Sequence, residues 1–129
     1  MYNKSRGIFD SGVGGLTVFK EVRKILPNES IVYLGDTYNF PYGDKTQDEI
    51  IKYSIKNVER LIDKGAKVVV VACGTATSQA IDSLKGKFDI PIIGIIDPTV
   101  EYVKKQRYKE IYGFCRNWRN DQIGRSNSW

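Results

Sequence analysis

The sequence predicts an α/β fold, a parallel β-sheet with helices on both faces in three layers. Short apolar runs alternate with amphipathic stretches along the first 106 residues, which is typical of repeated strand–helix–strand units. A run of four valines within 67–72 favours a strand buried on both faces of such a sheet. With 129 residues, the chain is long enough for one domain or for one half of a two-domain protein.

The individual elements follow from the spacing of apolar residues and from the residues that end each pattern. Spacings of three and four predict helices, and short apolar runs without them predict strands. Pro27 ends the first helix, and Thr46 with Glu49 forms a capping box that begins the second. The expected strands are 6–9, 30–34, 67–72 and 91–96, and the expected helices are 16–26, 46–64, 77–88 and 99–106. The resulting architecture is flavodoxin-like.

The end of the chain differs from the part before it. Residues 1–103 carry 13 basic and 13 acidic side chains, whereas residues 104–129 carry seven basic and two acidic ones and hold the whole net charge of +5. From Cys115 onward the sequence has neither a strand period nor a helix period. We therefore expect an α/β domain at 1–111 and interpret 112–129 as an anomalous tail, truncated or out of frame.

Composition excludes several classes of protein. A chain that is 41% hydrophobic and 27% charged is not disordered, and no apolar run approaches the roughly 20 residues that span a bilayer. No signal peptide is visible, so a cytoplasmic location is expected. Histidine is absent, which removes Ser-His and Cys-His mechanisms, and two cysteines alone cannot form a four-ligand metal site. The neutral body argues against a nucleic-acid partner.

Side chains capable of chemistry follow the ends of the predicted strands. They are Asp10-Ser11, Asp36-Thr37, Cys73-Gly74-Thr75 and Asp97. Because the carboxyl ends of parallel strands meet at one edge of the sheet, and ligands bind beyond that edge, the sequence predicts a site there.

Each of these motifs has a structural as well as a functional interpretation. The glycine-rich turn at 12–15 could bind an anion or only form a tight turn capped by Asp10. It lacks the third glycine of a dinucleotide fingerprint, which argues against a nucleotide or flavin site. Cys73 is either a thiolate favoured by a helix N-terminus or a small buried hydrophobe. Asp36 could bind an amine or close a turn, and Tyr42 could belong to a β-turn or cover the mouth of the site.

Four segments, taken together in their order and spacing, resemble the glutamate racemase family. They are Phe9-Asp10-Ser11-Gly12-Val13-Gly14-Gly15-Leu16-Thr17-Val18, Gly35-Asp36-Thr37, Phe40-Pro41-Tyr42-Gly43 and Ala72-Cys73-Gly74-Thr75-Ala76-Thr77. The resemblance covers about residues 6–111. It implies a protein of two α/β domains, often dimeric, that inverts glutamate without a cofactor or metal and supplies D-glutamate for bacterial peptidoglycan. Two cysteines on opposite sides of the substrate α-carbon transfer the proton.

Carried over residue by residue, the resemblance makes Cys73 the acid/base of the first half, assisted by Asp10. The residues implied to hold or surround the substrate are Ser11, Asp36, Thr37, Pro41, Tyr42, Gly43, Gly74 and Thr75. Two departures matter: Gly74 stands where the family usually has Asn, and the second cysteine has no counterpart. We therefore expect this chain alone not to racemise glutamate. Action on another acidic amino acid such as aspartate, and a non-catalytic amino-acid-binding module, stay open as alternatives.

Overall fold

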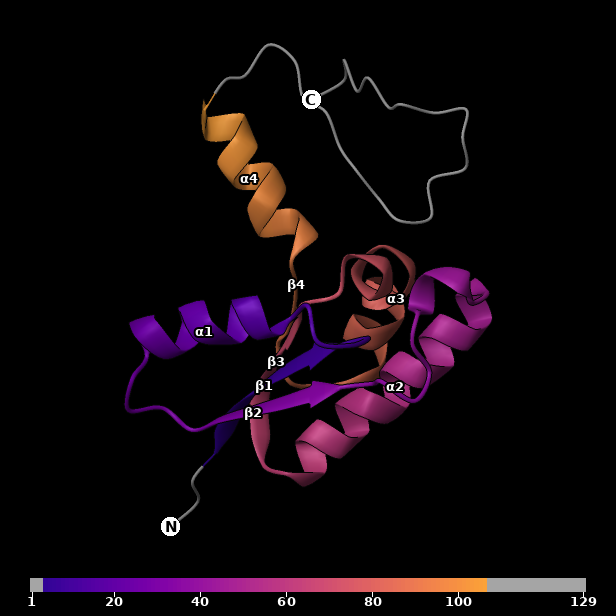
Figure 1. Ribbon diagram of the computed structural model, residues 1–129, viewed down its shortest axis with the longest axis horizontal. Coiled ribbons are helices and arrows are strands. Elements are labelled where there is room, and N and C mark those ends of the chain that lie inside the picture. The colour runs from indigo at the N-terminus through magenta and orange to yellow at the C-terminus, as the bar shows by residue number, and fades with distance from the viewer. Residues whose placement is uncertain (1–3, 107–129) are drawn as a thin grey trace.

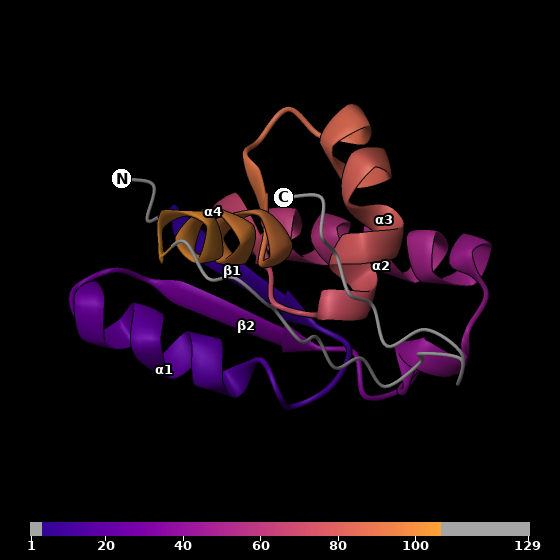
Figure 2. The same ribbon diagram turned by 90° about the horizontal axis from the view of Figure 1, so that it is seen from above.

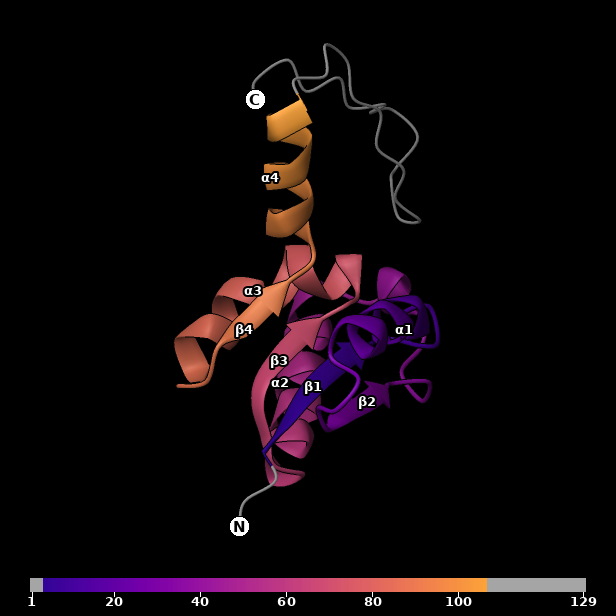
Figure 3. The same cartoon turned by 90° about the vertical axis from the view of Figure 1, so that its left-hand side faces the viewer.

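The computed structural model describes residues 4–106 and confirms the α/β prediction (Figure 1). Within this range, parallel strands form one sheet in the order β2-β1-β3-β4 (Figure 3). The elements are β1 (Ser5–Asp10), α1 (Leu16–Ile25), β2 (Ile31–Gly35), the short 3₁₀ helix η1 (Tyr42–Asp44), α2 (Gln47–Asp63), β3 (Ala66–Val71), α3 (Gly74–Lys87), β4 (Ile92–Gly94) and α4 (Ile96–Gln106). The predicted domain boundary after residue 111, the tail and Cys115 lie outside the described residues.

One face of the sheet is closely packed against α2 and α3 (Figure 2). The strand register aligns Gly7 with Val69, so both residues face the same side. A methyl group added to Gly7 would lie 3.2 Å from a methyl of Leu61 on α2, which shows how closely this helix approaches the strands. Phe9, Val69 and Leu61 are completely buried there. The main apolar core therefore lies on this face.

The opposite face is covered unevenly. Helix α1 packs on β2, where Phe19 meets Tyr33 edge-on with 6.3 Å between the ring centroids. Val68 and Val70 of β3 are only half-buried, and the Ile93 side chain is 44% exposed. The expectation that β3 is buried on both faces is therefore wrong for this side. The reason is that α4 extends away from the sheet, and no described helix covers β3 and β4 here (Figures 1 and 3).

Local signals explain most of the helix ends. The Thr46 hydroxyl accepts a hydrogen bond from the Glu49 amide at 3.2 Å, so the predicted N-cap of α2 is confirmed. Helix α2 ends at Asp63, and Gly65 then adopts a φ of 90°, a conformation that favours glycine. Helices α3 and α4 each begin three residues earlier than predicted, at 74 and 96.

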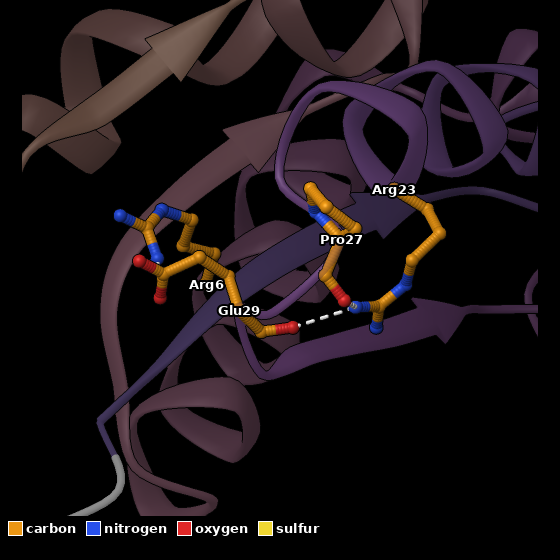
Figure 4. Close-up of polar contacts among 4 residues, drawn as sticks. All are labelled: Arg6, Arg23, Pro27 and Glu29. Atoms are coloured by element: carbon orange, nitrogen blue, oxygen red, sulfur yellow. Dashed lines mark hydrogen bonds and ion pairs between the residues drawn. The ribbon is translucent and has the colours of Figure 1, made fainter.

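A cluster of polar contacts holds the connection between α1 and β2 (Figure 4). The Arg23 guanidinium donates hydrogen bonds to the carbonyl oxygens of Pro27, at 3.1 Å, and Glu29, at 2.7 Å. The Glu29 carboxylate in turn forms an ion pair with Arg6 of β1. These contacts anchor the start of β2 beside β1, so that both strands run in register to the opposite, carboxyl edge of the sheet.

Candidate active site

Asp10 ends β1 and organises the glycine-rich turn that follows. Its Oδ2 accepts hydrogen bonds from the backbone amides of Gly15, at 2.9 Å, and Gly12, at 3.3 Å. A side chain on Gly15 would collide with Asp10 itself, because an added Cβ would lie 2.8 Å from the Asp10 Cβ. The capping interpretation of Asp10 is therefore confirmed, and the other oxygen, Oδ1, takes part in none of these bonds.

Tyr33 of β2 supports the same turn from the neighbouring strand. Its hydroxyl donates to the Gly12 carbonyl oxygen at 2.8 Å and lies 3.5 Å from Asp10 Oδ2. Burial first, and then the Asp10 carboxylate, raise the pKa of Tyr33 to about 12. The phenol therefore stays protonated at neutral pH and acts as a fixed donor.

Cys73 lies between the end of β3 and the start of α3. Its sulfur accepts a hydrogen bond from the Ala76 amide at 3.4 Å and so caps the helix, which explains why α3 begins at Gly74. The thiol also contacts the Ser11 hydroxyl, with 3.4 Å between Sγ and Oγ. Cys73 is 6% exposed, and it is a free thiol. The structure has features of both interpretations of Cys73: the thiol is buried, as a small hydrophobe would be, and it lies at a helix N-terminus.

Ser11 is the link between the Asp10 turn and the thiol. β1 and β3 are neighbours in the sheet, so their carboxyl ends lie side by side. No hydrogen bond joins Asp10 directly to Cys73 within residues 4–106; Ser11, which follows Asp10, makes the contact instead.

Asp36, after the end of β2, is the centre of a buried polar cluster. Its Oδ2 accepts hydrogen bonds from the Tyr42 hydroxyl at 2.5 Å, the Asn57 amide at 2.9 Å and the Asn39 amide at 3.0 Å. Burial alone raises the pKa of Asp36, but the hydrogen bonds from Tyr42, Asn39 and Asn57 together outweigh it and lower that pKa. The carboxylate is therefore ionised at neutral pH, although it is only 5% exposed.

Tyr42 is buried, so its side chain is not exposed at the carboxyl edge of the sheet. It begins η1, is 1% exposed and packs its ring against Phe9, with 5.9 Å between centroids. Burial, followed by the hydrogen bond to Asp36, raises the pKa of the Tyr42 phenol. Pro41 and Gly43, on either side, are half-buried.

The remaining predicted residues lie nearer the surface. Thr37 and Gly74 are exposed, and Thr75 is half-buried in the first turn of α3. A Cβ added to Gly74 would meet nothing within 4 Å, so there is open space beside Cys73. Asp97 lies on α4 and is further from the rest of the group in character: its side chain is 85% exposed and lies 4.0 Å from the Lys85 ammonium of α3.

Sequence reasoning missed Asn57, Asn39 and Arg60, which complete the Asp36 cluster. The Arg60 guanidinium donates to Asn57 Oδ1 at 3.0 Å. A signal for Asn57 was available, because it is a polar residue on the apolar stripe of α2, between the buried positions Ser54 and Leu61.

Between residues 4 and 106, no three His, Cys, Asp or Glu side chains gather in a way that could hold a metal ion. In the same range, no helix combines the length and the apolar character needed to cross a membrane.

Comparison with known proteins defines the family. The family model for Asp/Glu/Hydantoin racemase matches residues 17–113. A glutamate racemase of Campylobacter curvus is 56% identical over 95 residues, which cover 74% of this chain and 35% of that protein. The chain belongs to the Asp/Glu/Hydantoin racemase family.

Solved structures agree in fold. The glutamate racemase of Aquifex pyrophilus superposes with a TM-score of 0.79 at 46% identity, over 81% of this chain and 42% of that one. The glutamate racemase of Francisella tularensis, solved in complex with D-glutamate, gives a TM-score of 0.76 at 39% identity, over 81% and 40% of the two chains. The chain thus spans about two fifths of the length of these two solved relatives.

Proposed function

We propose that this chain contributes one acid/base group, Cys73, to a glutamate racemase that forms D-glutamate for peptidoglycan. The observation that carries the proposal is the position of Cys73, at the N-terminus of α3 and in contact with Ser11, at the carboxyl edge of a racemase-family sheet. The backbone amide of Ala76 donates a hydrogen bond to the sulfur in the first turn of α3. Relatives named glutamate racemase supply the substrate class.

The proposed chemistry is a proton transfer at the substrate α-carbon. The Cys73 thiolate removes the α-proton, so the C–H bond breaks, an S–H bond forms, and the electron pair is delocalised into the substrate carboxylate. A thiolate becomes more basic as water leaves the site, which suits a buried position. Asp10, through its second oxygen, would assist the proton handling of the thiol. Inversion requires a second acid on the opposite side of the α-carbon.

Substrate contacts follow from the same edge of the sheet. Ser11, Thr75 and the adjacent backbone amides would hold the substrate carboxylates, and the segment Pro41–Gly43 would line the pocket. Asp36 and Thr37 stand beside it. Because the chain spans only part of the relatives' length, we expect it not to interconvert the two glutamate enantiomers by itself. A cytoplasmic location and a dimer of the whole protein stay predictions.

Protection of Cys73 from alkylation tests this function. Iodoacetamide labelling of the 129-residue chain, followed peptide by peptide with mass spectrometry, gives the rate at Cys73 separately from Cys115. Glutamate at ten times its dissociation constant should slow the reaction about tenfold, because only about a tenth of the sites stays free. Leucine at the same concentration is the control and should have no effect. Labelling that glutamate does not slow would contradict the proposal.

Aspartate is the second candidate substrate, and the open space beside Gly74 is the observation that favours it. A side chain that could hydrogen-bond the substrate is missing at this position. Stronger protection by aspartate than by glutamate in the same assay would shift the substrate assignment to aspartate.

A further inference from the structure

We propose that Asn57 of α2 is a positioning residue for the Cys73 site, acting through Asp36 and Tyr42. The inference rests on the proposed function, because it matters only if Cys73 transfers protons. It concerns a side chain that lies in a buried helix face and outside the four motifs of the strand ends.

The orientation of the Asn57 amide is determined by its neighbours. Arg60 can only donate hydrogen bonds, so the Asn57 atom 3.0 Å from its guanidinium must be the oxygen. The Asn57 nitrogen then faces Asp36 Oδ2, at 2.9 Å, and the Tyr42 hydroxyl oxygen, at 2.8 Å. Asn57 is 1% exposed, so water cannot replace these bonds.

Tyr42 has a single hydroxyl proton, and the hydroxyl donates it in a hydrogen bond to Asp36 Oδ2 at 2.5 Å. The Asn57 amide donates a hydrogen bond to the oxygen of the same hydroxyl. The Tyr42 hydroxyl therefore has a partner both as donor and as acceptor. The ring therefore holds the Pro41–Gly43 segment in a fixed place. Tyr42 and Cys73 belong to the same buried cluster, so this segment and the start of α3 share a packed wall.

The cluster also carries an electrostatic consequence for the thiol. Asp36 has no cationic partner among the described residues, and its charge is balanced only by the donors Tyr42, Asn39 and Asn57. Tyr42 is hydrogen-bonded to Asp36 and belongs to the same buried cluster as Cys73, so it lies between the carboxylate and the start of α3 in the packed core. Removing one donor leaves the Asp36 charge less compensated, and the resulting negative potential disfavours a thiolate at Cys73.

Other titratable groups near this region are few. Tyr33 of β2 lies 3.5 Å from Asp10 Oδ2, at the end of β1. The Tyr53 hydroxyl of α2 donates to the Glu49 carboxylate at 3.4 Å. On the outer side of Asn57 stands Arg60, an exposed cation.

The test is the pH dependence of Cys73 alkylation by iodoacetamide in the full chain, without glutamate. Asn57→Leu removes the donor at similar size, and we expect the midpoint of the rate profile to move up by about half a pH unit, or roughly threefold in rate below the midpoint. Ser54→Ala is the matched control, since this buried hydroxyl of the same helix has no hydrogen-bond partner.

Arg60→Gln keeps the test informative if the buried variants do not fold, because Arg60 lies at the surface. We expect a smaller upward shift than for Asn57→Leu. Lys56→Gln removes an equal charge one helical turn from Arg60, at an exposed side chain that makes no hydrogen bond to Asn57, and should leave the midpoint in place. An unchanged midpoint in Asn57→Leu, or equal shifts in Arg60→Gln and Lys56→Gln, would overturn the proposal.

A purely structural role for Asn57 gives the opposite signature. Loosening of the fold would expose the thiol and raise its labelling rate at every pH, with the midpoint unchanged. The two proposals also fail separately. If glutamate does not protect Cys73 but the Asn57→Leu midpoint still shifts, the positioning role stands and the racemase function is contradicted.

Discussion

The ends of β1 and β2 each carry a buried aspartate, yet the two carboxylates are held in different ways. Asp10 is 6% exposed, and backbone amides of its own turn bind one of its oxygens. Asp36 is 5% exposed, and side chains from the following loop, η1 and α2 occupy both of its oxygens. A place at the carboxyl edge therefore does not define a role by itself: side chains hold both oxygens of Asp36, whereas the turn binds only Oδ2 of Asp10.

The largest difference should come from replacing each carboxylate by an amide. Asp36→Asn brings its new NH₂ group against donors from Asn57 and Asn39, and we expect a loss of about 2–3 kcal/mol in the free energy of unfolding. Asp10→Asn can still accept the Gly15 amide through its oxygen and should lose about 1 kcal/mol. Urea unfolding followed by far-UV circular dichroism measures both, and equal losses would remove the distinction.

Acid should destabilise the folded chain through Asp36. Its pKa is lower in the folded chain than the unfolded value of about 3.9, so its contribution to stability is fully present above about pH 4. That contribution is lost as the pH falls from there through the folded-state pKa. Urea midpoints measured between pH 6 and pH 2.5 should therefore fall less steeply in Asp36→Asn than in the wild type. Parallel curves would show that Asp36 is not stabilised as an anion.

Tyr33→Phe probes the Asp10 side of the comparison. The variant loses the hydrogen bond to the Gly12 carbonyl oxygen, and we expect a cost of about 1 kcal/mol. Because the pKa of Tyr33 is raised to about 12, the cost should be the same at pH 5 and pH 9. Thermal unfolding at both pH values checks this. A loss as large as that of Asp36→Asn would mean that the two aspartate regions are equally committed to stability.

The smallest effect on stability is expected for Gly74→Asn. Nothing lies within 4 Å of a Cβ at this exposed position, and the change should alter the free energy of unfolding by less than about 0.5 kcal/mol. The added amide stands beside Cys73, so glutamate should protect the thiol at lower concentration than in the wild type. Unchanged protection would show that this position does not contact the substrate.

Periodicity predicted the elements well, because strand and helix spacing is a local property of the sequence. The start of α3 was misplaced because a cysteine is not among the usual capping residues, and only the structure shows Ala76 donating to its sulfur. The half-burial of Val68 and Val70 on β3 could not be inferred from the sequence, because it depends on the direction in which α4 leaves the sheet. Asp36 and Tyr42 lie within the family motifs, whereas their partner Asn57 comes from α2 and is marked in the sequence only as a polar residue on an apolar helix stripe.

Hydrogen exchange at the glutamate α-carbon tests the central claim most directly. A single thiolate removes the α-proton from one side only, exchanges it with solvent and returns a deuteron to the same side. In D₂O, the 129-residue chain should therefore introduce deuterium into one enantiomer without changing its configuration, and Cys73→Ala should not. Absence of exchange in the wild-type chain, exchange that persists in Cys73→Ala, or conversion of one enantiomer into the other would contradict the account.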